Sequence, residues 1–167
     1  LSQTGDYTLQ ISDFQSNDTG SYEFSFDRFN DPINSTDITF GSTLSGDIDF
    51  QTELSFYKFE ADAGDELALQ LHGESAVNPN VQIFDVNGNL VASAGRSNFD
   101  DHRRADLTTT LGYSGAYTLQ ITDHWINETG CYNFSLNRFN NPLNTIDVEF
   151  GDNFVGETEF SSEYDVY

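Results

Sequence analysis

The chain has little of what would place it in several large classes of protein. Of its 167 residues one is cysteine, Cys131, and none is methionine, while 6 lysines and arginines stand against 28 aspartates and glutamates. A single cysteine excludes an intrachain disulfide, and with it a small fold held together by disulfides. The net charge of -22 gives the surface a negative field at neutral pH, which argues against nucleic acid as a partner.

Long apolar runs and familiar catalytic motifs are missing too. No stretch approaches the length of a membrane-spanning helix, and no signal peptide is visible. The sequence has no Gly-x-Ser-x-Gly turn, no His-Glu-x-x-His pair and no glycine loop that would hold phosphate. A Ser-His-Asp group assembled by the fold is the alternative that spacing leaves open. We expect a protein without catalytic activity.

What the chain does have is repetition. Residues 1–57 return as residues 111–167, with about 26 identities over 57 positions and no gap. Residues 5–13 reappear as 115–123, and residues 28–34 reappear as 138–144. A period of about 110 residues is too long for a solenoid unit and suits an autonomous domain.

The repeat predicts three parts. Residues 1–37 are the C-terminal half of a preceding module plus a linker, residues 38–139 are a complete module, and residues 140–167 are a linker and the first strands of a following module. Partial modules would leave strand edges unpaired. We expect a continuous longer polypeptide to supply the missing strands, rather than separate subunits that complete one another by strand addition.

Alternating apolar residues predict an all-β fold. Apolar side chains alternate with polar or small ones through residues 67–71, 117–121 and 132–136. Turns with glycine are expected at residues 62–65 and 87–89. Several short strands with one apolar face indicate an antiparallel sandwich, in which two sheets bury their aromatic faces against each other.

Several short motifs occur in a fixed order along the chain. They are Phe40-Gly41, Gly46, Glu53, Tyr57, Phe59, Ala63-Gly64-Asp65, Pro79-Asn80-Val81, residues 84–88, residues 114–119 and residues 129–132. In order and spacing they resemble the bacterial pre-peptidase C-terminal domain family. Ser55 stands where that family usually has an acidic residue, and the second copy has the acid in Glu163-Tyr164-Asp165-Val166-Tyr167.

The resemblance implies a jelly-roll-like β-sandwich in secreted bacterial and archaeal proteins. Such modules are accessories, appended to secreted proteases, binding polymers such as collagen, or standing in tandem in large surface proteins. The resemblance implies no catalytic residues. Together with the repeat, it predicts jelly-roll-like antiparallel sandwiches in tandem, with a period of about 110 residues, outside the cell or on its surface.

Carboxylate and amide side chains provide candidate cation ligands. Asp85, Asn87 and Asn89 alternate in a glycine-containing turn, as at the start of a loop that binds a hard cation, although no downstream glutamate completes an EF-hand. Glu53 and, in the second copy, Glu163 and Asp165 are further candidates. Calcium is the one cofactor that the sequence suggests. The alternative is that these residues serve turn geometry and solubility.

Four Asn-x-Ser/Thr sequences are candidate glycosylation sites, at Asn17, Asn34, Asn127 and Asn133. Asn17 and Asn127 are equivalent between the copies. The first three fall in expected loops or linker, and Asn133 is expected to point outward from its strand, as is Cys131. Such triplets also arise by chance in a chain rich in asparagine and threonine.

The one tryptophan, Trp125, occupies a loop where the other copy has Gln15. Trp125 either stacks on a sugar or docks a protein partner, or it caps the end of the sandwich core.

These observations predict a non-catalytic extracellular structural repeat, part of a fibre, surface filament or adhesin stalk. Its partners would be copies of itself or adjacent repeats of the same chain. The alternative is an accessory module of a secreted hydrolase that binds a carbohydrate or protein polymer. A third hypothesis is a stalk that calcium stabilises by binding only the folded state.

Overall fold

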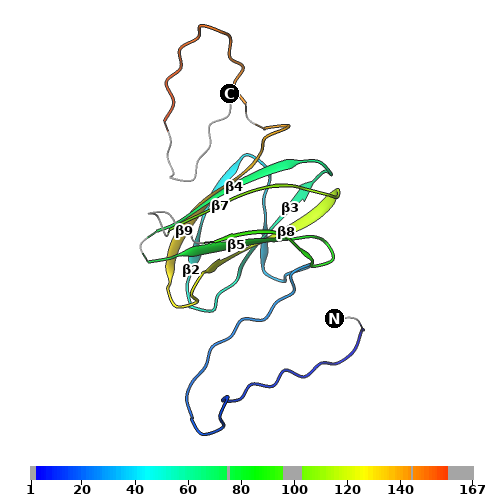
Figure 1. Ribbon diagram of the computed structural model, residues 1–167, viewed down its shortest axis with the longest axis vertical. Coiled ribbons are helices and arrows are strands. Elements are labelled where there is room, and N and C mark those ends of the chain that lie inside the picture. The colour runs from blue at the N-terminus through cyan, green and yellow to red at the C-terminus, as the bar shows by residue number, and fades with distance from the viewer. Residues whose placement is uncertain (1–2, 75, 96–102, 144, 158–167) are drawn as a thin grey trace.

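The computed structural model describes residues 3–74, 76–95, 103–143 and 145–157, and it contains one β-sandwich (Figure 1). Its strands are β1 (Ser35–Asp37), β2 (Ser42–Ile48), β3 (Ser55–Ala61), β4 (Glu66–Gly73), β5 (Pro79–Phe84), β6 (Leu90–Gly95), β7 (Arg104–Thr110), β8 (Gly115–Asp123) and β9 (Gly130–Arg138). Within the described ranges, no helix is long and apolar enough to cross a membrane.

The strands form two facing sheets. Sheet A has the order β1-β3-β8-β5-β6 and sheet B the order β2-β9-β4-β7. Neighbours pair antiparallel, except that β1 lies parallel to β3. The pairs β2–β9, β3–β8, β4–β7 and β5–β6 are nested one inside the next, which is the topology of a jelly roll. The expected antiparallel, jelly-roll-like sandwich is therefore confirmed for one module.

Side chains from the two inner faces fill the space between the sheets. Leu67, Leu69 and Leu71 on β4 are each 1% exposed, and the alternating apolar residues of β8 and β9 are buried as well. Among the aromatic rings, Phe59 lies with its centroid 5.7 Å from that of Phe40 and 5.6 Å from that of Tyr117. Burial of this apolar surface drives the two sheets together, at about 25 cal/mol for each Å² removed from water.

A buried pair of tyrosines joins the two sheets near the edge formed by β2. The hydroxyl oxygens of Tyr57 on β3 and Tyr132 on β9 lie 2.8 Å apart in a hydrogen bond. A Cβ at Gly46 on β2 would lie 2.5 Å from the Tyr132 hydroxyl and 2.8 Å from the Tyr57 hydroxyl, so only glycine leaves room for the pair. Burial raises the pKa of both tyrosines above the ordinary value of 10.0, so both hydroxyls keep their protons at alkaline pH where exposed tyrosines begin to ionise.

Two described segments lie outside the sandwich, on opposite sides of it in Figure 1. We call residues 3–28 the N-terminal segment and residues 145–157 the C-terminal segment; neither contains a strand. The sequence repeat equates residues 5–13 with β8, residues 20–28 with β9, and residues 152–157 with most of β2. Sequences that form strands in the module are thus unpaired in the two end segments.

The module also takes in residues that the sequence assigned to the linker. β1 lies ahead of the expected start at Ile38 and pairs with β3, and the Ile38 amide donates a hydrogen bond to the Lys58 carbonyl over 2.8 Å. A parallel three-residue strand leaves no alternating pattern long enough to be recognised from sequence.

Candidate functional site: the end segments and the turns of the module

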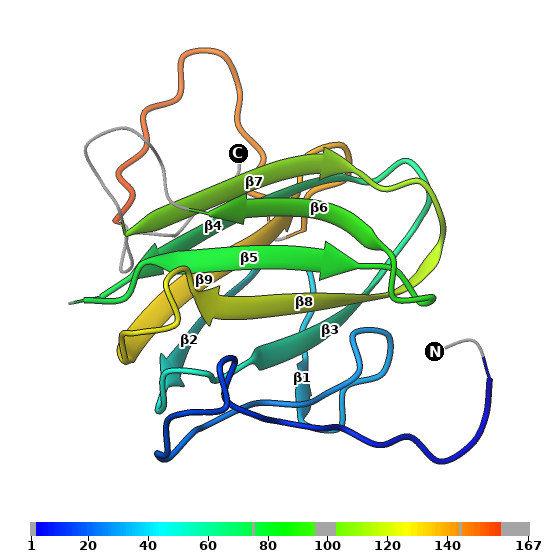
Figure 2. The same cartoon turned by 60° about the horizontal axis from the view of Figure 1, so that its bottom comes forward.

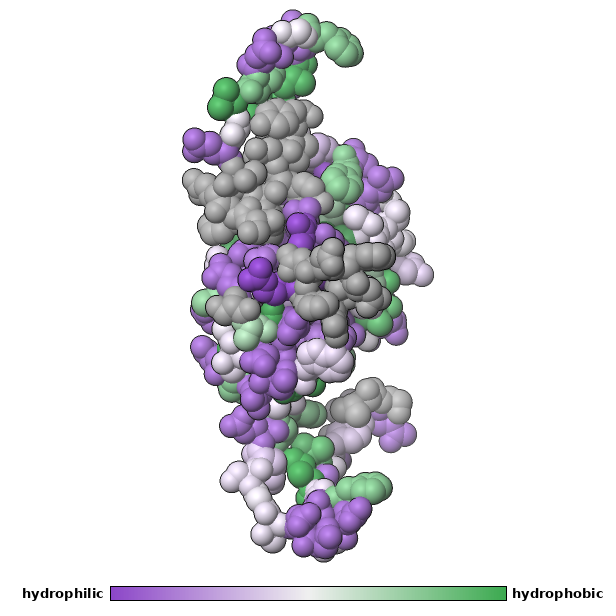
Figure 3. Space-filling model, turned by 60° about the vertical axis from the view of Figure 1, so that its left-hand side comes forward, coloured by the Kyte–Doolittle hydropathy of each residue, from purple (hydrophilic) through white to green (hydrophobic). Residues whose placement is uncertain are grey.

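Large apolar side chains are exposed along both end segments. In the parts of the N-terminal segment that repeat the sequences of β8 and β9, they are Tyr7 (57% exposed), Leu9 (60%), Ile11 (44%), Tyr22 (66%), Phe24 (53%) and Phe26 (79%). Their equivalents in β8 and β9 are at most 3% exposed. In the space-filling view, apolar atoms lie on the projections at both ends of the long axis (Figure 3). Monomeric proteins rarely expose apolar surface in this way, so the end segments form the candidate interaction site.

A turn after β8 carries Trp125 and Asn127. The buried Asp123 carboxylate accepts hydrogen bonds from the amides of Asn78 (2.9 Å), Trp125 (3.2 Å) and Asn127 (3.1 Å). Ile126 completes the turn with a φ of 55°. One carboxylate therefore ties the turn to the start of β5 and sets the directions of the side chains that follow it.

The same turn occurs in the N-terminal segment, outside any sheet. Asp13 accepts hydrogen bonds from the amides of Gln15 and Asn17, each over 3.1 Å, and Ser16 has a φ of 57°. The bond from the Asn17 amide contributes most to lowering the pKa of the Asp13 carboxyl. The aspartate turn is thus a local structure that forms without the surrounding sandwich.

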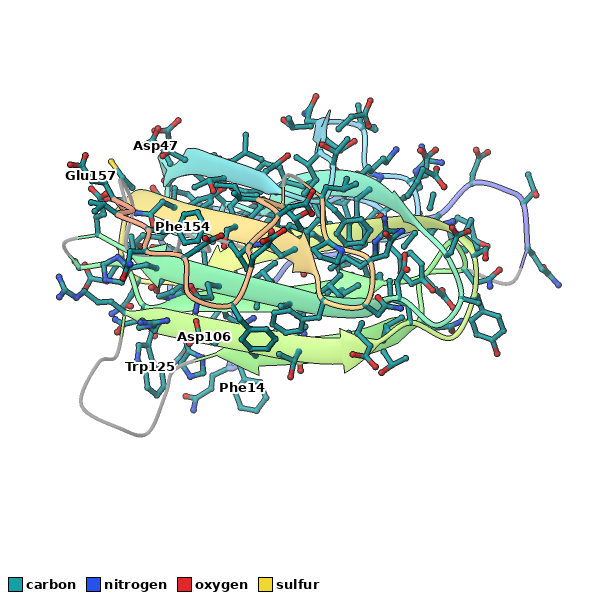
Figure 4. All side chains as sticks on the ribbon, turned by 90° about the horizontal axis from the view of Figure 1, so that it is seen from above. Phe14, Asp47, Asp106, Trp125, Phe154 and Glu157 are labelled. Atoms are coloured by element: carbon teal, nitrogen blue, oxygen red, sulfur yellow. The ribbon has the colours of Figure 1, made fainter. Side chains whose placement is uncertain are left out.

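Trp125 does not sit inside the core. Its side chain is 57% exposed, and its ring meets the His124 ring edge-on with centroids 4.7 Å apart. Figure 4 shows Trp125 at the periphery of the molecule, away from the two sheets. This exposure leaves the Trp125 ring accessible, and both interpretations drawn from the sequence, a cap on the end of the core and a surface that binds a partner, remain predictions.

The Asp85 turn is held by its own hydrogen bonds. Asp85 Oδ1 accepts from the amides of Asn87 (2.9 Å) and Asn89 (2.8 Å), and Oδ2 accepts from the Asn89 side-chain amide (2.9 Å). The side-chain bond from Asn89 is the main cause of the lowered pKa of Asp85. Turn geometry alone accounts for these residues, and calcium binding here remains a prediction.

The other candidate ligands are not brought to this turn. Glu53 precedes β3 and accepts from the amides of Asp49 (2.5 Å) and Phe50 (3.4 Å). β3 and β5 both pair antiparallel with β8, so Glu53 lies at the opposite end of sheet A from Asp85, which follows β5. Glu163 and Asp165 lie outside the described residues. Among those that are described, no three His, Cys, Asp or Glu side chains cluster to hold a metal ion.

Three of the four candidate glycosylation sites are accessible. Asn17, Asn34 and Asn127 are exposed. Asn133 points away from the core between the sheets, as expected, but it is only 4% exposed, and its side-chain amide donates to Glu74 Oε1 over 3.3 Å. Although Asn133 lies on the outer face of its sheet, β9 is an interior strand between β2 and β4, whose side chains crowd that face.

Cys131 is exposed and free, as expected from the strand alternation. It lies opposite Asp47 in the pairing of β2 with β9. A hydrogen bond with Asp47 and the negative charge of that carboxylate raise the pKa of the thiol, because both disfavour the thiolate. Exposure alone therefore does not make this thiol reactive.

Two features of the module left no recognisable signal in the sequence. One is the tyrosine pair beneath Gly46. The other is the pair of Arg138 with Asp65, whose side chains are 13% and 7% exposed and whose Nη1 and Oδ2 atoms lie 3.1 Å apart. The repeated Arg-Phe-Asn-x-Pro sequence was the available hint, since it recurs at 28–32 and 138–142, but its partners belong to distant strands.

Comparison with known proteins bears on the fold. No protein-family model matches the chain, and no curated protein matches it. Among solved structures, the pre-peptidase C-terminal domain of a collagenase from Bacillus anthracis aligns with a TM-score of 0.50 at 17% identity, over 64% of this chain and 98% of that domain. A periplasmic inhibitor of g-type lysozyme from Aeromonas hydrophila aligns with a TM-score of 0.48 at 16% identity, over 64% of this chain and all of that one (100%).

A similar inhibitor from Salmonella Typhimurium aligns with a TM-score of 0.41 at 15% identity, over 60% of this chain and 97% of that one. The alignment with the collagenase domain shows that the chain has a fold like that of a pre-peptidase C-terminal domain, as its motifs suggested.

Proposed function

We propose that the chain is a non-catalytic structural repeat of an extracellular or cell-surface fibre, filament or adhesin stalk built from tandem sandwich modules. The observation that carries the proposal is the contrast between buried β8 and β9 and the exposed copies of their sequences in the N-terminal segment. Tyr22, Phe24 and Phe26 have the pattern of core residues, and a neighbouring module would cover them.

The nested topology favours neighbours in the same polypeptide. In the module, β8 lies between β3 and β5, and β9 lies between β2 and β4. The C-terminal segment of a second chain offers equivalents of β1 and β2, but the sequence holds only one copy of residues 58–110, which include β4 and β5. A covalent array supplies all four flanking strands, whereas head-to-tail association of separate chains would leave both sheets incomplete.

The charge distribution fits modules linked end to end. Arg28, Lys58, Arg104 and Arg138 each form an ion pair with an aspartate, and the sequence has 28 acidic residues against 6 basic ones. Like-charged surfaces repel each other laterally and keep fibres apart. Glycans at Asn17, Asn34 and Asn127, and calcium at acidic sites, would be modifications of such a surface.

Electron microscopy of the native material, with the intact mass measured on the same sample, tests this proposal. We expect regular filaments whose repeat matches the length of one sandwich, and a polypeptide mass that corresponds to many periods of about 110 residues. Dispersed monomers with a mass near that of this chain would overturn the proposal.

A second candidate function is favoured by Trp125. An exposed indole beside His124 suits stacking on a sugar or docking on a protein, as in an accessory module of a secreted hydrolase. Pull-down on insoluble polysaccharides and on fibrillar collagen tests it. Retention that is lost in Trp125→Ala and kept in Phe14→Ala, a change at a 98% exposed ring on the equivalent turn, would favour this function.

A further inference from the structure

The chain that leads into the sandwich is docked on the outer face of sheet A. The Phe29 ring stacks on that of Phe84, with centroids 4.4 Å apart and planes 3° from parallel, and lies 6.5 Å from that of Phe56. Phe56 and Phe84 are only 4% and 5% exposed, yet neither belongs to the core cluster between the sheets. Figure 2 shows this part of the chain passing beneath β3 and β1. Two large apolar side chains of the outer face are thus covered from outside.

Further contacts hold the same short stretch. Lys58 Nζ of β3 donates to Asp31 Oδ1 over 3.0 Å, and this hydrogen bond lowers the pKa of the Asp31 carboxyl. Pro32 is buried, and the Ile33 amide donates to Asp27 Oδ1 over 3.1 Å. Residues 28–32, just before β1, are therefore held against the module by an aromatic ring, a proline and an ion pair.

The second copy of this sequence, residues 138–142, is held from the other side. Arg138 is paired with Asp65, and its guanidinium lies 5.0 Å from the centroid of the Phe40 ring. The Asn140 side chain accepts from the Glu66 amide and donates to the Gly64 carbonyl, each over 3.0 Å. Here the arginine and the asparagine bind the module that the segment ends.

The two copies of the segment therefore make different contacts, each with the module on one side only. Phe29, Asp31 and Pro32 bind the module that follows them, while Arg138 and Asn140 bind the module that precedes them. The two sets of side chains are different, because Arg28 and Asn30 remain exposed while Phe29 is docked, and Arg28 pairs with Asp31 of its own segment over 3.2 Å. Each segment can thus engage a module on both sides at once.

We infer that the Arg-Phe-Asn-x-Pro segment is a two-sided joint that fixes successive modules relative to one another. The outer face of sheet A around Phe56 and Phe84 is the docking surface, and its partner is the end of a preceding module of the same kind. The inference rests on the proposed tandem arrangement. Because both ends of this short segment are bound, successive modules would have a defined relative orientation, which a flexible linker would not give them.

Hydrogen exchange of the full chain tests the docked half of the joint. In Phe29→Ala we expect the amides of residues 33–38 to exchange about tenfold faster, because the ring stack that holds the segment is lost. The matched control Phe14→Ala removes a ring that is 98% exposed and should leave these rates unchanged. Equal exchange in Phe29→Ala and the parent chain would overturn the joint.

The other half is tested by a second matched pair. Asn140→Ala should speed exchange at the Phe139 amide, which donates to the Glu66 carbonyl over 2.9 Å, whereas Asn30→Ala should change nothing in this chain. If neither variant has an effect, the segment is not held by its own module and the joint is overturned.

The joint and the array can fail separately. If the native material forms filaments but residues 28–32 are not docked on sheet A, the array is supported and the joint is overturned. Dispersed monomers with the segment docked would overturn the proposed array, and with it the assignment of this contact to successive modules.

Discussion

Two regions of the molecule share a five-residue sequence but differ in secondary structure and burial. Tyr-Thr-Leu-Gln-Ile occurs at residues 7–11 and again at residues 117–121. In β8 it forms the middle of sheet A, with Leu119 fully buried (0% exposed), while in the N-terminal segment it forms no strand and Leu9 is 60% exposed. The difference shows that these residues become a strand only between β3 and β5, because strand propensity is largely the fit to neighbouring strands.

The turn that follows each copy, by contrast, has the same structure in both places. The hydrogen bonds within each turn join residues at most four positions apart, so Asp13 and Asp123 form the same turn with and without a sandwich around it. Local bonds survive the loss of tertiary contacts, whereas ladders between strands do not.

The largest effect is expected when equivalent phenylalanine rings are removed from the module and from the N-terminal segment. Phe134→Ala deletes a fully buried ring (0% exposed) that packs on Tyr57 and should lower the free energy of unfolding by about 3–5 kcal/mol. Phe24→Ala deletes the equivalent ring of the N-terminal segment and should leave the thermal midpoint of the module unchanged. Both are read by calorimetry. A similar loss in both variants would mean that the segment contributes to the core.

The aspartates of the two turns give the next contrast. Asp123→Ala leaves three backbone amides without their acceptor at a buried position, and should cost about 2 kcal/mol of unfolding free energy. Asp13→Ala should free only residues 15–17, with no change in the denaturant midpoint of the sandwich. Equal midpoints for both variants would contradict a structural role for the Asp123 carboxylate.

Gly46 and its equivalent Gly156 test the tyrosine pair. A methyl group at residue 46 collides with both tyrosine hydroxyls, so Gly46→Ala should cost about 1–3 kcal/mol through overpacking. Gly156→Ala, in the exposed C-terminal segment, should have no effect on chemical denaturation. An unchanged Gly46→Ala protein would show that the two sheets separate easily at this edge.

High pH probes the same pair. Burial raises the pKa of Tyr57 and Tyr132 above the ordinary value of 10.0, so the folded protein keeps protons that the unfolded chain releases. Their contribution to stability is complete below pH 10 and is lost as the pH rises through the folded-state values. We expect the denaturant midpoint to fall above pH 10, and to fall less steeply in Tyr132→Phe than in Tyr22→Phe. The same steepness in both variants would locate the loss elsewhere.

The smallest expected effect concerns Cys131, which replaces Ser21 of the other copy. Because Asp47 raises the pKa of the thiol, Asp47→Asn should increase its rate of alkylation by iodoacetamide at pH 8 without changing stability. Asp37→Asn, an exposed acid on β1, is the control. A rate unaffected by Asp47→Asn would show that the carboxylate does not touch the thiol in solution.

Much of the module could be read from residue patterns. Alternation identified the inward residues of β4, β8 and β9, because the side chains of a strand point to opposite faces in turn. Alternation also gave the outer face of Asn133 correctly, but it does not give the exposure of a side chain, which depends on the strands to either side. The contact among Phe29, Phe56 and Phe84 could not be predicted from the sequence for a related reason. They come from three separate stretches of chain and meet on a face that alternation marks as outer.

The sequence by itself determined the repeat, the acidic surface, the strand faces and the aspartate turns, because each depends on composition or on residues close together in the chain. Only the tertiary structure decided which copy of Tyr-Thr-Leu-Gln-Ile becomes a strand, how the strands nest into a jelly roll, and where residues 28–32 dock. Those outcomes depend on contacts between distant residues. Such contacts stabilise a strand or a joint only when the partner strands are present to bury its apolar side chains and satisfy its backbone hydrogen bonds.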